Sequence, residues 1–399
     1  MALTLTTAGE SHGLEVVAVL AGLPAGLEVD RAALDREMAR RQHGYGRGGR
    51  QKIERDQVEV RAGLRDGVTL GSPLLLAVRN RDWQNWSAVM DPWQVDGARA
   101  ARKRLTAPRP GHADLAGAWK YGHLDDLRNV LERASARETA ARVAAGAVCR
   151  QLLARLGVEI RSGVLALGDV TLHEGPPSFA DLARVQDDSP LRTVAPEREG
   201  ELVATVDAAK RAGETLGGVI GVVARGVPPG LGSYVTWEAR LDGQLAQAAM
   251  SVPAVKAVAI GAGLEAAGRP GSAAHDPIVP GSGHLRRASN HAGGLEGGVS
   301  NGEEIVLRAF MKPIATLRDP LPSVDLATGE AARAAYERSD VTAVPACGVI
   351  LEAMLAFVLA RAVLAKFGGD HLHDTLAAVA GYRQRLGDLA PEGFSIGMR

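Results

Sequence analysis

The chain has 399 residues, 46% of them hydrophobic, and its 46 Lys and Arg residues balance 46 Asp and Glu residues. This length and apolar content can bury a large core in one or two domains, and the neutral balance argues against an extended nucleic-acid-binding face. Only two cysteines occur, Cys149 and Cys347, which excludes a disulfide framework and suits a reducing cytosol.

The first half of the chain predicts short strands and one helix. The N-terminal segment MALTLTTAGESHG lacks the basic and apolar stretches of a secretory signal. An apolar run at 14–20 ends in GLPAG, which predicts a strand and a turn. A helix is expected over 30–41 with Asp30 as its N-cap. Strands are expected over 57–62 and 74–78, whereas 82–109, rich in tryptophan and cations, shows no clear pattern.

The second half contains the strongest helical signals. Ser135 and Glu138 match the S-x-x-E capping box, and apolar residues then recur at every fourth position until Gly157. Strands are expected within GETLGGVIGVVARGVPPGLGSY and over 255–260 and 304–310. The apolar stretch 348–367 contains Glu352 and Arg361, so it predicts a buried amphipathic helix rather than a membrane span. Helices and strands alternate without a regular βαβ rhythm, which favours an α+β fold.

Positive charge is concentrated in one glycine-rich segment, RRQHGYGRGGRQKIER at 40–55. Glycine lets backbone N–H groups turn toward a ligand, and arginine matches the geometry of phosphate and carboxylate groups. The segment therefore predicts an anion site, although composition alone is explained equally well by a solvated surface loop. Its six cations are Arg40, Arg41, Arg47, Arg50, Lys52 and Arg55.

Two histidines are candidate proton donors. His12 follows Ser11 in GESHG, and neighbours on an extended chain point to opposite faces, so a Ser–His pair is not expected there. His112 lies beside Arg109 in the rigid turn PRPGHAD. A histidine in either place is also compatible with a purely structural role.

Arg133 and Arg137 flank the predicted helix start, where the helix dipole disfavours cations. A bound anion would explain their position, whereas ordinary capping would explain only Ser135 and Glu138.

Three weaker signals occur farther along the chain. The glycine loop around Gly297 and the segment Lys312–Thr316 could wrap a phosphate or a planar ring, and Asp340 is a candidate base or a surface-turn residue. The sequence GAGLEA at 261–266 matches a dinucleotide-binding pattern, but the glycines and proline that follow leave no room for the helix such a site needs. No Cys/His spacing predicts a metal site.

Taken together, these segments closely resemble chorismate synthases. The motifs GESHG, RRQHGYGRGGR, TAPRPGHADL, ERASARETAARVAAGA, GGVSNG, MKPIAT and RSDVTAVPA occur in the family's order and span Gly9 to Ala346, nearly the whole chain. The resemblance implies a single α+β domain over 1–399 in which helices lie between antiparallel sheets. It also implies a cytoplasmic homotetramer that binds neither nucleic acid nor membranes.

The resemblance further implies an activity, the 1,4-anti elimination of phosphate from 5-enolpyruvylshikimate 3-phosphate to give chorismate. This last step of the shikimate pathway requires reduced FMN without net redox change. A bifunctional enzyme that also reduces flavin with NADPH is the alternative, and a polyanion-binding protein is a third hypothesis. We expect a monofunctional enzyme, because the chain has no convincing further nucleotide motif.

The family's roles can be transferred residue by residue. His12 would keep the reduced flavin suitably protonated, His112 would donate a proton to the departing phosphate, and Asp340 would help the flavin accept the C6 proton. The substrate's anionic groups would meet Arg41, Arg47, Arg50, Arg109 and Arg137. The flavin would meet Arg133, Ala134, Ser135, Pro253, Ala254, Gly297, Lys312, Pro313, Ile314, Ala315, Thr316 and Arg338.

Two positions depart from the family pattern, which commonly has a second serine at Ala134 and an asparagine at Pro253. Proline lacks both the amide side chain and the backbone N–H, so only its carbonyl could still contact a flavin there. The glycines around Arg50 also suggest a loop that becomes ordered only when substrate and flavin bind.

Overall fold

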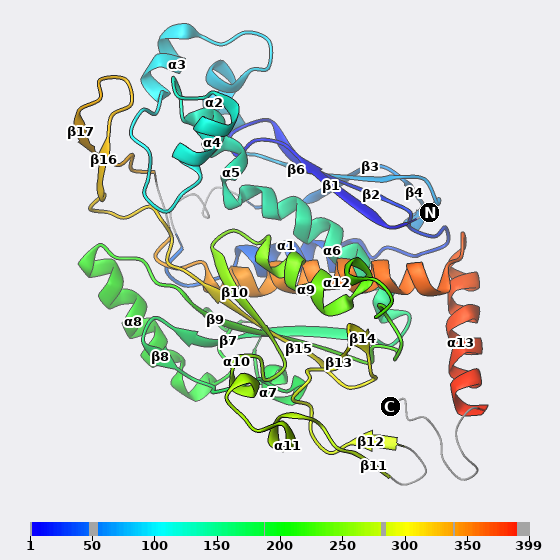
Figure 1. Ribbon diagram of the computed structural model, residues 1–399. Coiled ribbons are helices and arrows are strands. Elements are labelled where there is room, and N and C mark those ends of the chain that lie inside the picture. The colour runs from blue at the N-terminus through cyan, green and yellow to red at the C-terminus, as the bar shows by residue number, and fades with distance from the viewer. Residues whose placement is uncertain (1, 48–54, 187, 281–284, 338–339, 389–399) are drawn as a thin grey trace.

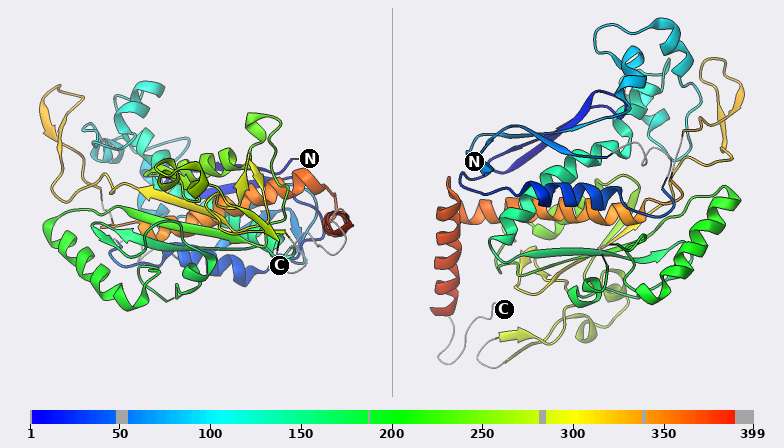
Figure 2. Two further views of the ribbon diagram at one scale, coloured as in Figure 1. Left: turned by 60° about the horizontal axis from the view of Figure 1, so that its bottom comes forward. Right: turned by 180° about the vertical axis from the view of Figure 1, so that it is seen from behind.

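Two antiparallel sheets face each other across a layer of helices in the computed structural model (Figure 1). The structure describes residues 2–47, 55–186, 188–280, 285–337 and 340–388. The view from behind shows the long helix α12 between the two sheets (Figure 2). The expected α+β sandwich is therefore confirmed.

The first sheet has four strands in the order β1-β2-β6-β3. Strand β2 alternates buried and partly exposed residues, as expected for a strand with one face on the core. Three of the strands fall where the sequence predicts them, within one or two residues at their ends. Their bounds are β1 (Thr4–Ala8), β2 (Glu15–Ala21), β3 (Val58–Ala62) and β6 (Leu74–Arg79), and a small hairpin adds β4 (Leu64–Arg65) and β5 (Val68–Thr69).

The second sheet has five strands in the order β10-β15-β9-β7-β8. The expected strand over 255–260 is confirmed, and the one expected over 304–310 is shifted by one residue. Their bounds are β7 (Glu159–Leu167), β8 (Val170–Thr171), β9 (Gly218–Arg225), β10 (Val255–Ile260) and β15 (Ile305–Met311).

The helix layer consists of α1 (Arg31–Gln42), α6 (Thr139–Ala154), α9 (Leu241–Met250) and α12 (Val344–Phe367). Helix α1 begins as predicted, with the Asp30 carboxylate accepting hydrogen bonds from two backbone N–H groups of its first turn. Helix α6 packs against the first sheet and α12 against the second, and the two helices pack on each other. The main hydrophobic core lies between the sheets along this layer.

The expected buried helix is confirmed, but α12 is buried along almost its whole length, so the expectation that it is amphipathic is wrong. It begins four residues earlier than the apolar stretch 348–367, with Pro345 in its first turn. Of its most apolar 18-residue window, 94% is buried inside the protein, as in the core helix of a globular domain. A helix flanked by a sheet and other helices has no side that must be polar.

The α6 start also differs from the sequence prediction, because the capping box does not form. Ser135 ends the preceding helix α5 (Arg128–Ala134), and its N–H donates to the Leu131 carbonyl oxygen at 3.0 Å. It is therefore unavailable to Glu138, whose carboxylate binds Arg142 instead. A 3-10 turn, η2 (Ala136–Glu138), separates the two helices.

The region 82–109, for which no structure was predicted, forms part of a lobe beside the first sheet (Figure 1). Within 82–109 lie α2 (Trp83–Met90) and α3 (Gly97–Lys103), and the lobe also contains α4 (Asp114–Tyr121) and α5. The hairpin of β16 (Pro322–Val324) and β17 (Ala331–Arg333) is joined to this lobe by backbone bonds at Thr106 and Ala107.

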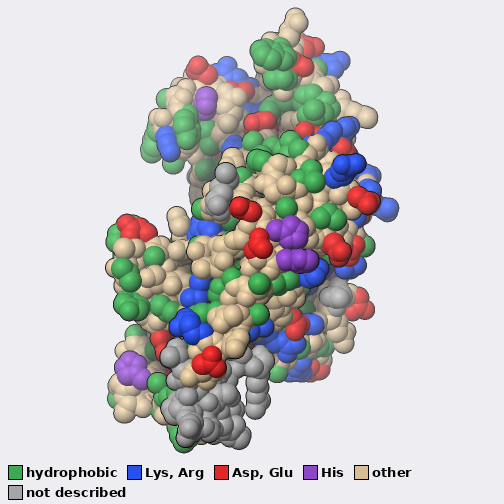
Figure 3. Space-filling view, turned by 90° about the vertical axis from the view of Figure 1, so that its right-hand side faces the viewer, with side chains coloured by type: hydrophobic (Ala, Val, Ile, Leu, Met, Phe, Trp, Pro, Cys, Tyr) green, Lys and Arg blue, Asp and Glu red, His purple; other side chains and the backbone are tan. Residues whose placement is uncertain are grey.

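The remaining elements are short, apart from the helices α8 and α13. They are β11 (Ile278–Pro280), β12 (Leu285–Arg287), β13 (Leu295–Glu296), β14 (Val299–Ser300), α7 (Phe179–Ala183), α8 (Glu199–Ala212), α10 (Leu264–Ala267), α11 (Gly271–Ala274), η3 (Pro196–Arg198), η4 (Trp237–Ala239) and the longer helix α13 (Leu372–Asp388). On the face that carries α13, basic and acidic side chains are interspersed (Figure 3).

The α6–α12 contact depends on Gly146. A Cβ atom there would lie 2.3 Å from the Ala353 Cβ and 2.6 Å from its carbonyl oxygen. We therefore expect Gly146→Ala to lower the free energy of unfolding by about 1–3 kcal/mol through overpacking. Gly381 lies at an exposed position of α13, and a Cβ atom there would meet no atom within 4 Å. Gly381→Ala should therefore raise the free energy of unfolding by about 0.5–1 kcal/mol. Urea unfolding of both variants tests the pair, and equal effects would contradict close helix packing.

Candidate active site

The GESHG loop follows β1 and is fixed by close backbone contacts. Gly9 has φ +106°, and a Cβ there would lie 2.4 Å from the Glu15 carbonyl oxygen, so only glycine fits. The Asn80 side chain donates to the carbonyl oxygens of Glu10 and Gly13 at 3.1 and 2.7 Å. The loop therefore holds His12 in a defined place against α5.

His12 is buried and contacts a carboxylate and an aromatic ring. Its Nδ1 lies 2.8 Å from Glu132 Oε1, and its ring stacks on Trp86 with centroids 4.0 Å apart. Arg128 donates to the same Glu132 oxygen at 3.2 Å. Sequence reasoning missed Glu132 and Trp86, because neither stands in a pattern that links it to GESHG.

A second cluster joins the arginines of α1 and η2. Arg41 and Arg137 donate to the two oxygens of the buried Asp56 carboxylate at 3.3 and 2.6 Å. Arg137 also donates to Asn80 Oδ1 at 2.6 Å, which connects this cluster to the GESHG loop. Asp56 thus supplies the negative charge that the arginines at the helix start require, so their position alone does not demand a bound anion.

Arg47 pairs with the predicted base Asp340 at 3.0 Å. Its Nε is buried and has no hydrogen-bond partner among the described residues, which is unfavourable unless another acceptor approaches. Burial lowers the pKa of Arg41 to about 10, an effect that Asp56 opposes and that Arg137 and Arg47 increase. The guanidinium groups of this cluster, those of Arg41, Arg47 and Arg137, pair with only two carboxylates, Asp56 and Asp340. The cluster therefore retains an excess of positive charge.

The PRPGHAD turn forms a third cluster around Asp114. His112 Nδ1 lies 2.5 Å from Asp114 Oδ1, and Arg109 Nε donates to Asp114 Oδ2 at 2.8 Å. Arg109 also donates to the Thr316 hydroxyl at 3.1 Å, and Lys312 Nζ donates to the Gly111 carbonyl oxygen at 2.6 Å. The predicted segment 312–316 therefore meets the predicted histidine turn.

One segment links the three clusters. The Ala335 N–H donates to the Ala107 carbonyl oxygen, Glu337 binds Arg128, and Asp340 binds Arg47. The described residues Ala335, Glu337 and Asp340 therefore lie next to the residue before the His112 turn, next to the arginine that binds Glu132, and in the arginine cluster, respectively.

The predicted flavin residues are only partly brought together. Ala254 accepts from the Lys312 N–H at 2.9 Å and has the left-handed φ of +69°, a strained conformation for a residue with a side chain. Arg133 is exposed and donates to the carbonyl oxygens of Thr7 and Gly9. Ala134 and Ser135 follow it at the end of α5, and Pro253 precedes Ala254. Arg50 and Arg338 lie outside the described residues.

Gly297 lies apart from the other predicted flavin residues within this chain. It turns the β13–β14 hairpin, which adjoins the first residues of β15, because a Cβ on Gly294 would lie 2.5 Å from the Glu304 carbonyl oxygen. Lys312 follows the last residue of β15, a strand of seven residues that spans roughly 20 Å. Within the described part of one chain, Gly297 and Lys312 are therefore too far apart to contact the same ligand group.

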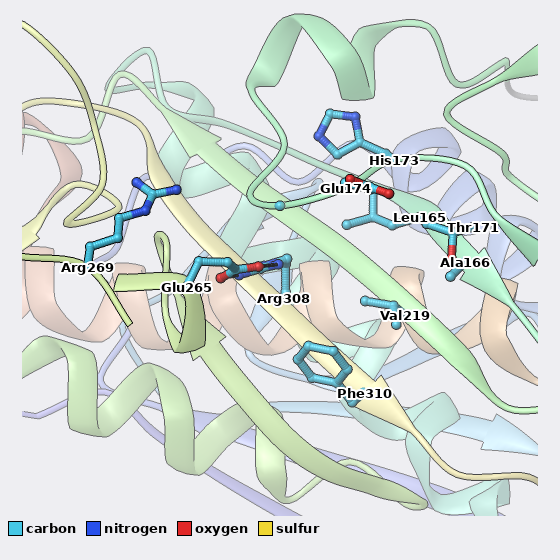
Figure 4. Close-up of a pocket in the computed structure, with 11 residues that line it drawn as sticks. Leu165, Ala166, Thr171, His173, Glu174, Val219, Glu265, Arg269, Arg308 and Phe310 are labelled. Atoms are coloured by element: carbon cyan, nitrogen blue, oxygen red, sulfur yellow. Dashed lines mark hydrogen bonds and ion pairs between the residues drawn. The ribbon is translucent and has the colours of Figure 1, made fainter. Parts of the chain in front are cut away.

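The GAGLEA sequence has a structural role. Its helix α10 has only four residues, and Glu265 forms a bidentate ion pair with the buried Arg308 of β15. The pair lies in a cavity of about 540 Å³ on the outer sheet face, lined also by His173, Arg269 and Phe310 (Figure 4). None of the predicted site residues that the structure describes lines this cavity.

The ionisation of Asp114 leads to a pH prediction. Burial acts to raise its pKa, but hydrogen bonds and charges from His112 and Arg109 hold the pKa below the usual 3.8. A depressed pKa means that the ionised carboxylate stabilises the folded state above about pH 4, and that this contribution is lost as the pH falls through the folded pKa. The stability gap between wild type and Asp114→Asn should therefore be full at pH 7 and shrink below pH 4. Urea unfolding at each pH measures this difference in the free energy of unfolding, and a difference that stays constant from pH 7 to pH 3 would contradict the prediction.

The fold is α+β, and its clusters hold two histidines against buried carboxylates beside an excess of positive charge. The sequence matches the chorismate synthase family over residues 3–364. It is 54% identical to chorismate synthase from Moorella thermoacetica over 384 residues, covering 96% of this chain and 99% of the relative. It is 51% identical to chorismate synthase from Mycolicibacterium smegmatis over 391 residues, covering 97% and 98%.

The structure is similar to a crystal structure of chorismate synthase, with a TM-score of 0.76 and 40% identity over 96% of this chain and 97% of that one. The chain therefore belongs to the chorismate synthase family, and the sequence resemblance is confirmed. It is a phosphate-eliminating carbon–oxygen lyase of aromatic amino acid biosynthesis.

Proposed function

We propose that the chain catalyses the 1,4-anti elimination of phosphate from 5-enolpyruvylshikimate 3-phosphate, giving chorismate, and that it requires reduced FMN. The observation that carries this proposal is the cluster of Arg41, Arg47 and Arg137, which keeps an excess of positive charge in a buried place. A substrate with one phosphate and two carboxylates is the kind of ligand that such a cluster attracts.

The residues expected to hold FMN suit that cofactor. Lys312 and Arg133 are cations that can meet a phosphate, Thr316 offers a hydroxyl, and the strained backbone at Ala254 is typical of a ligand contact. Bound reduced FMN would supply reversible electron donation, chemistry that no protein side chain provides. Gly297 would have to reach it from a second copy of the chain, in keeping with the homotetramer that the family resemblance implies.

The remaining roles belong to side chains of this chain. His112 would give its proton to the leaving phosphate, with Asp114 and Arg109 fixing the orientation of its ring. Asp340, paired with Arg47, would assist removal of the C6 proton. His12 would hold a proton beside the cofactor. Burial against Trp86 limits the access of water to His12, which strengthens the electrostatic interaction of His12 with Glu132.

The decisive experiment is an anaerobic assay with reduced FMN and 5-enolpyruvylshikimate 3-phosphate. Release of phosphate together with the absorbance of chorismate supports the proposal, and the absence of both refutes it. The same assay with oxidised FMN and NADPH separates the monofunctional enzyme that we propose from the bifunctional alternative. Steady NADPH consumption by the pure protein would favour the alternative.

Arg47 offers a test of the anion cluster. Because its buried Nε lacks a partner among the described residues, a bound anion would gain a charge-assisted hydrogen bond there, worth about 1.5–3 kcal/mol. We expect Arg47→Gln to raise the KM for the substrate by roughly 10- to 100-fold. The exposed Arg65→Gln is the matched control and should leave the KM unchanged. An unchanged KM in Arg47→Gln would contradict the proposed contact.

A further inference from the structure

The Glu132 side chain is almost completely buried and binds His12 twice. Its Oε2 accepts from the His12 backbone N–H at 2.7 Å, and its Oε1 lies 2.8 Å from His12 Nδ1. The Glu132 carbonyl oxygen also accepts from the Ser11 N–H at 2.9 Å. One residue of α5 thus fixes both the backbone and the ring of His12.

The charge state of Glu132 determines which ring nitrogen carries the proton. Burial acts to raise the pKa of Glu132, but hydrogen bonds and charge from His12, together with Arg128, hold the pKa below its usual value. The group is therefore a carboxylate at neutral pH, and a carboxylate only accepts hydrogen bonds. Nδ1 of a neutral His12 must then carry the hydrogen, and Nε2 has the lone pair.

The ring is also fixed from its face. Trp86 stacks on it with an interplanar angle of 28°. Lys103 Nζ and the Arg128 guanidinium lie over the same indole ring at 4.6 and 4.8 Å from its centroid. Rotation of the imidazole out of this plane would break the stacking and the bond between Nδ1 and Glu132, so the ring orientation and the tautomer are set together.

We infer that Glu132 is a positioning residue that fixes His12 as the Nδ1-protonated tautomer, so that Nε2 is the atom through which His12 gains and loses its proton in the reaction. The inference rests on the proposed role of His12. It does not make Glu132 a catalytic residue, because Glu132 acts through the imidazole.

Glu132→Gln tests this inference, because an amide has only one accepting oxygen. The His12 backbone N–H is always a donor, so the single amide oxygen is expected to take the place of Oε2, which accepts from that N–H at 2.7 Å. The amide NH₂ group would then face Nδ1, and Arg128 would give up its longer bond of 3.2 Å to this position and keep its bond to Glu337. The imidazole can accept a hydrogen bond from the NH₂ group only by moving its own hydrogen to Nε2. We therefore expect the tautomer to reverse and kcat to fall on the order of 100-fold.

The tautomer can be measured without turnover, from ¹⁵N NMR of protein labelled at its ten histidines, at a pH that keeps the imidazole neutral. The His12 signals are assigned by their loss in His12→Gln. Glu337→Gln is the matched control, because Glu337 binds the other side of Arg128 at 3.1 Å and its replacement removes the same charge. Glu132→Asp retains the charge and should restore the Nδ1-protonated form.

The outcomes separate the inference from the proposed function. A reversed tautomer in Glu132→Gln, with the original form in Glu337→Gln and Glu132→Asp, supports the inference. An unchanged tautomer in Glu132→Gln overturns it, whatever happens to turnover. A reversed tautomer with unchanged kcat supports the fixing of the ring by Glu132 and refutes the proposed role of His12 in the reaction.

Discussion

Replacing His112 by glutamine should lower kcat by about 10²- to 10⁴-fold, the usual contribution of a positioned proton donor. Glutamine keeps the size and polarity of the side chain but cannot transfer a proton to a leaving phosphate. Asp114 and Arg109 remain to hold the turn, because they bind each other directly at 2.8 Å. The loss should therefore appear in turnover, and the affinity for FMN should stay within a few-fold of wild type.

The His112 measurement needs single-turnover kinetics and a separate titration of FMN. His123→Gln, in the loop between α4 and α5 and outside the three clusters, is the matched control and should keep its kcat. A collapse of FMN affinity in His112→Gln would assign His112 to cofactor binding. Normal kcat in the variant would remove it from the reaction altogether.

The largest effect on stability is expected at Glu352 in the middle of α12. Its fully buried carboxylate accepts from Arg40 at 2.8 Å and from the Ser162 hydroxyl at 2.6 Å, and it also binds Arg150 and Arg192. Burial acts to raise the pKa of Glu352, but these arginines hold it well below its usual value. Glu352→Gln would remove the carboxylate that the three arginines share and leave Glu37 as the remaining carboxylate beside Arg40 and Arg150, which costs about 3–5 kcal/mol.

Urea unfolding of Glu352→Gln measures this cost directly. The matched control is Glu159→Gln, which breaks the half-exposed pair with Arg225 and should cost less than about 1 kcal/mol. Glu352→Asp keeps the charge on a shorter side chain, so its loss in the free energy of unfolding should lie between the losses in Glu352→Gln and Glu159→Gln. Equal losses at positions 352 and 159 would contradict a buried charge centre in the helix layer.

Local signals in the sequence predicted much of the fold. Asp30 caps α1 as expected, and β10 has the expected bounds, because capping and strand patterns act over a few neighbouring residues. The same reasoning failed at Ser135. The capping-box pattern was present, but the N–H that it needs was already used by α5, and a pattern within one segment cannot show how the preceding helix ends.

The sequence also identified most of the candidate site residues, through family motifs and through their charge. His12, His112, Arg41, Arg47 and Arg137 lie in clusters in the structure. The residues that it missed, Glu132, Asp56 and Trp86, are the neutralising and packing partners. Each is separated from the group it serves by at least 15 residues, as Asp56 is from Arg41, and by as many as 120, as Glu132 is from His12.

By itself, the sequence determined the family, the α+β class and the types of charged and titratable group available for chemistry, because these depend on residue identity and local spacing. The tertiary structure decided which charges meet. It placed Asp56 between two arginines, Glu132 against His12, and Glu352 at the centre of the helix layer, while it set Gly297 at the far end of β15 from Lys312. Coulomb and hydrogen-bond energies depend on distance and burial, and these arise only when segments far apart in the chain pack together.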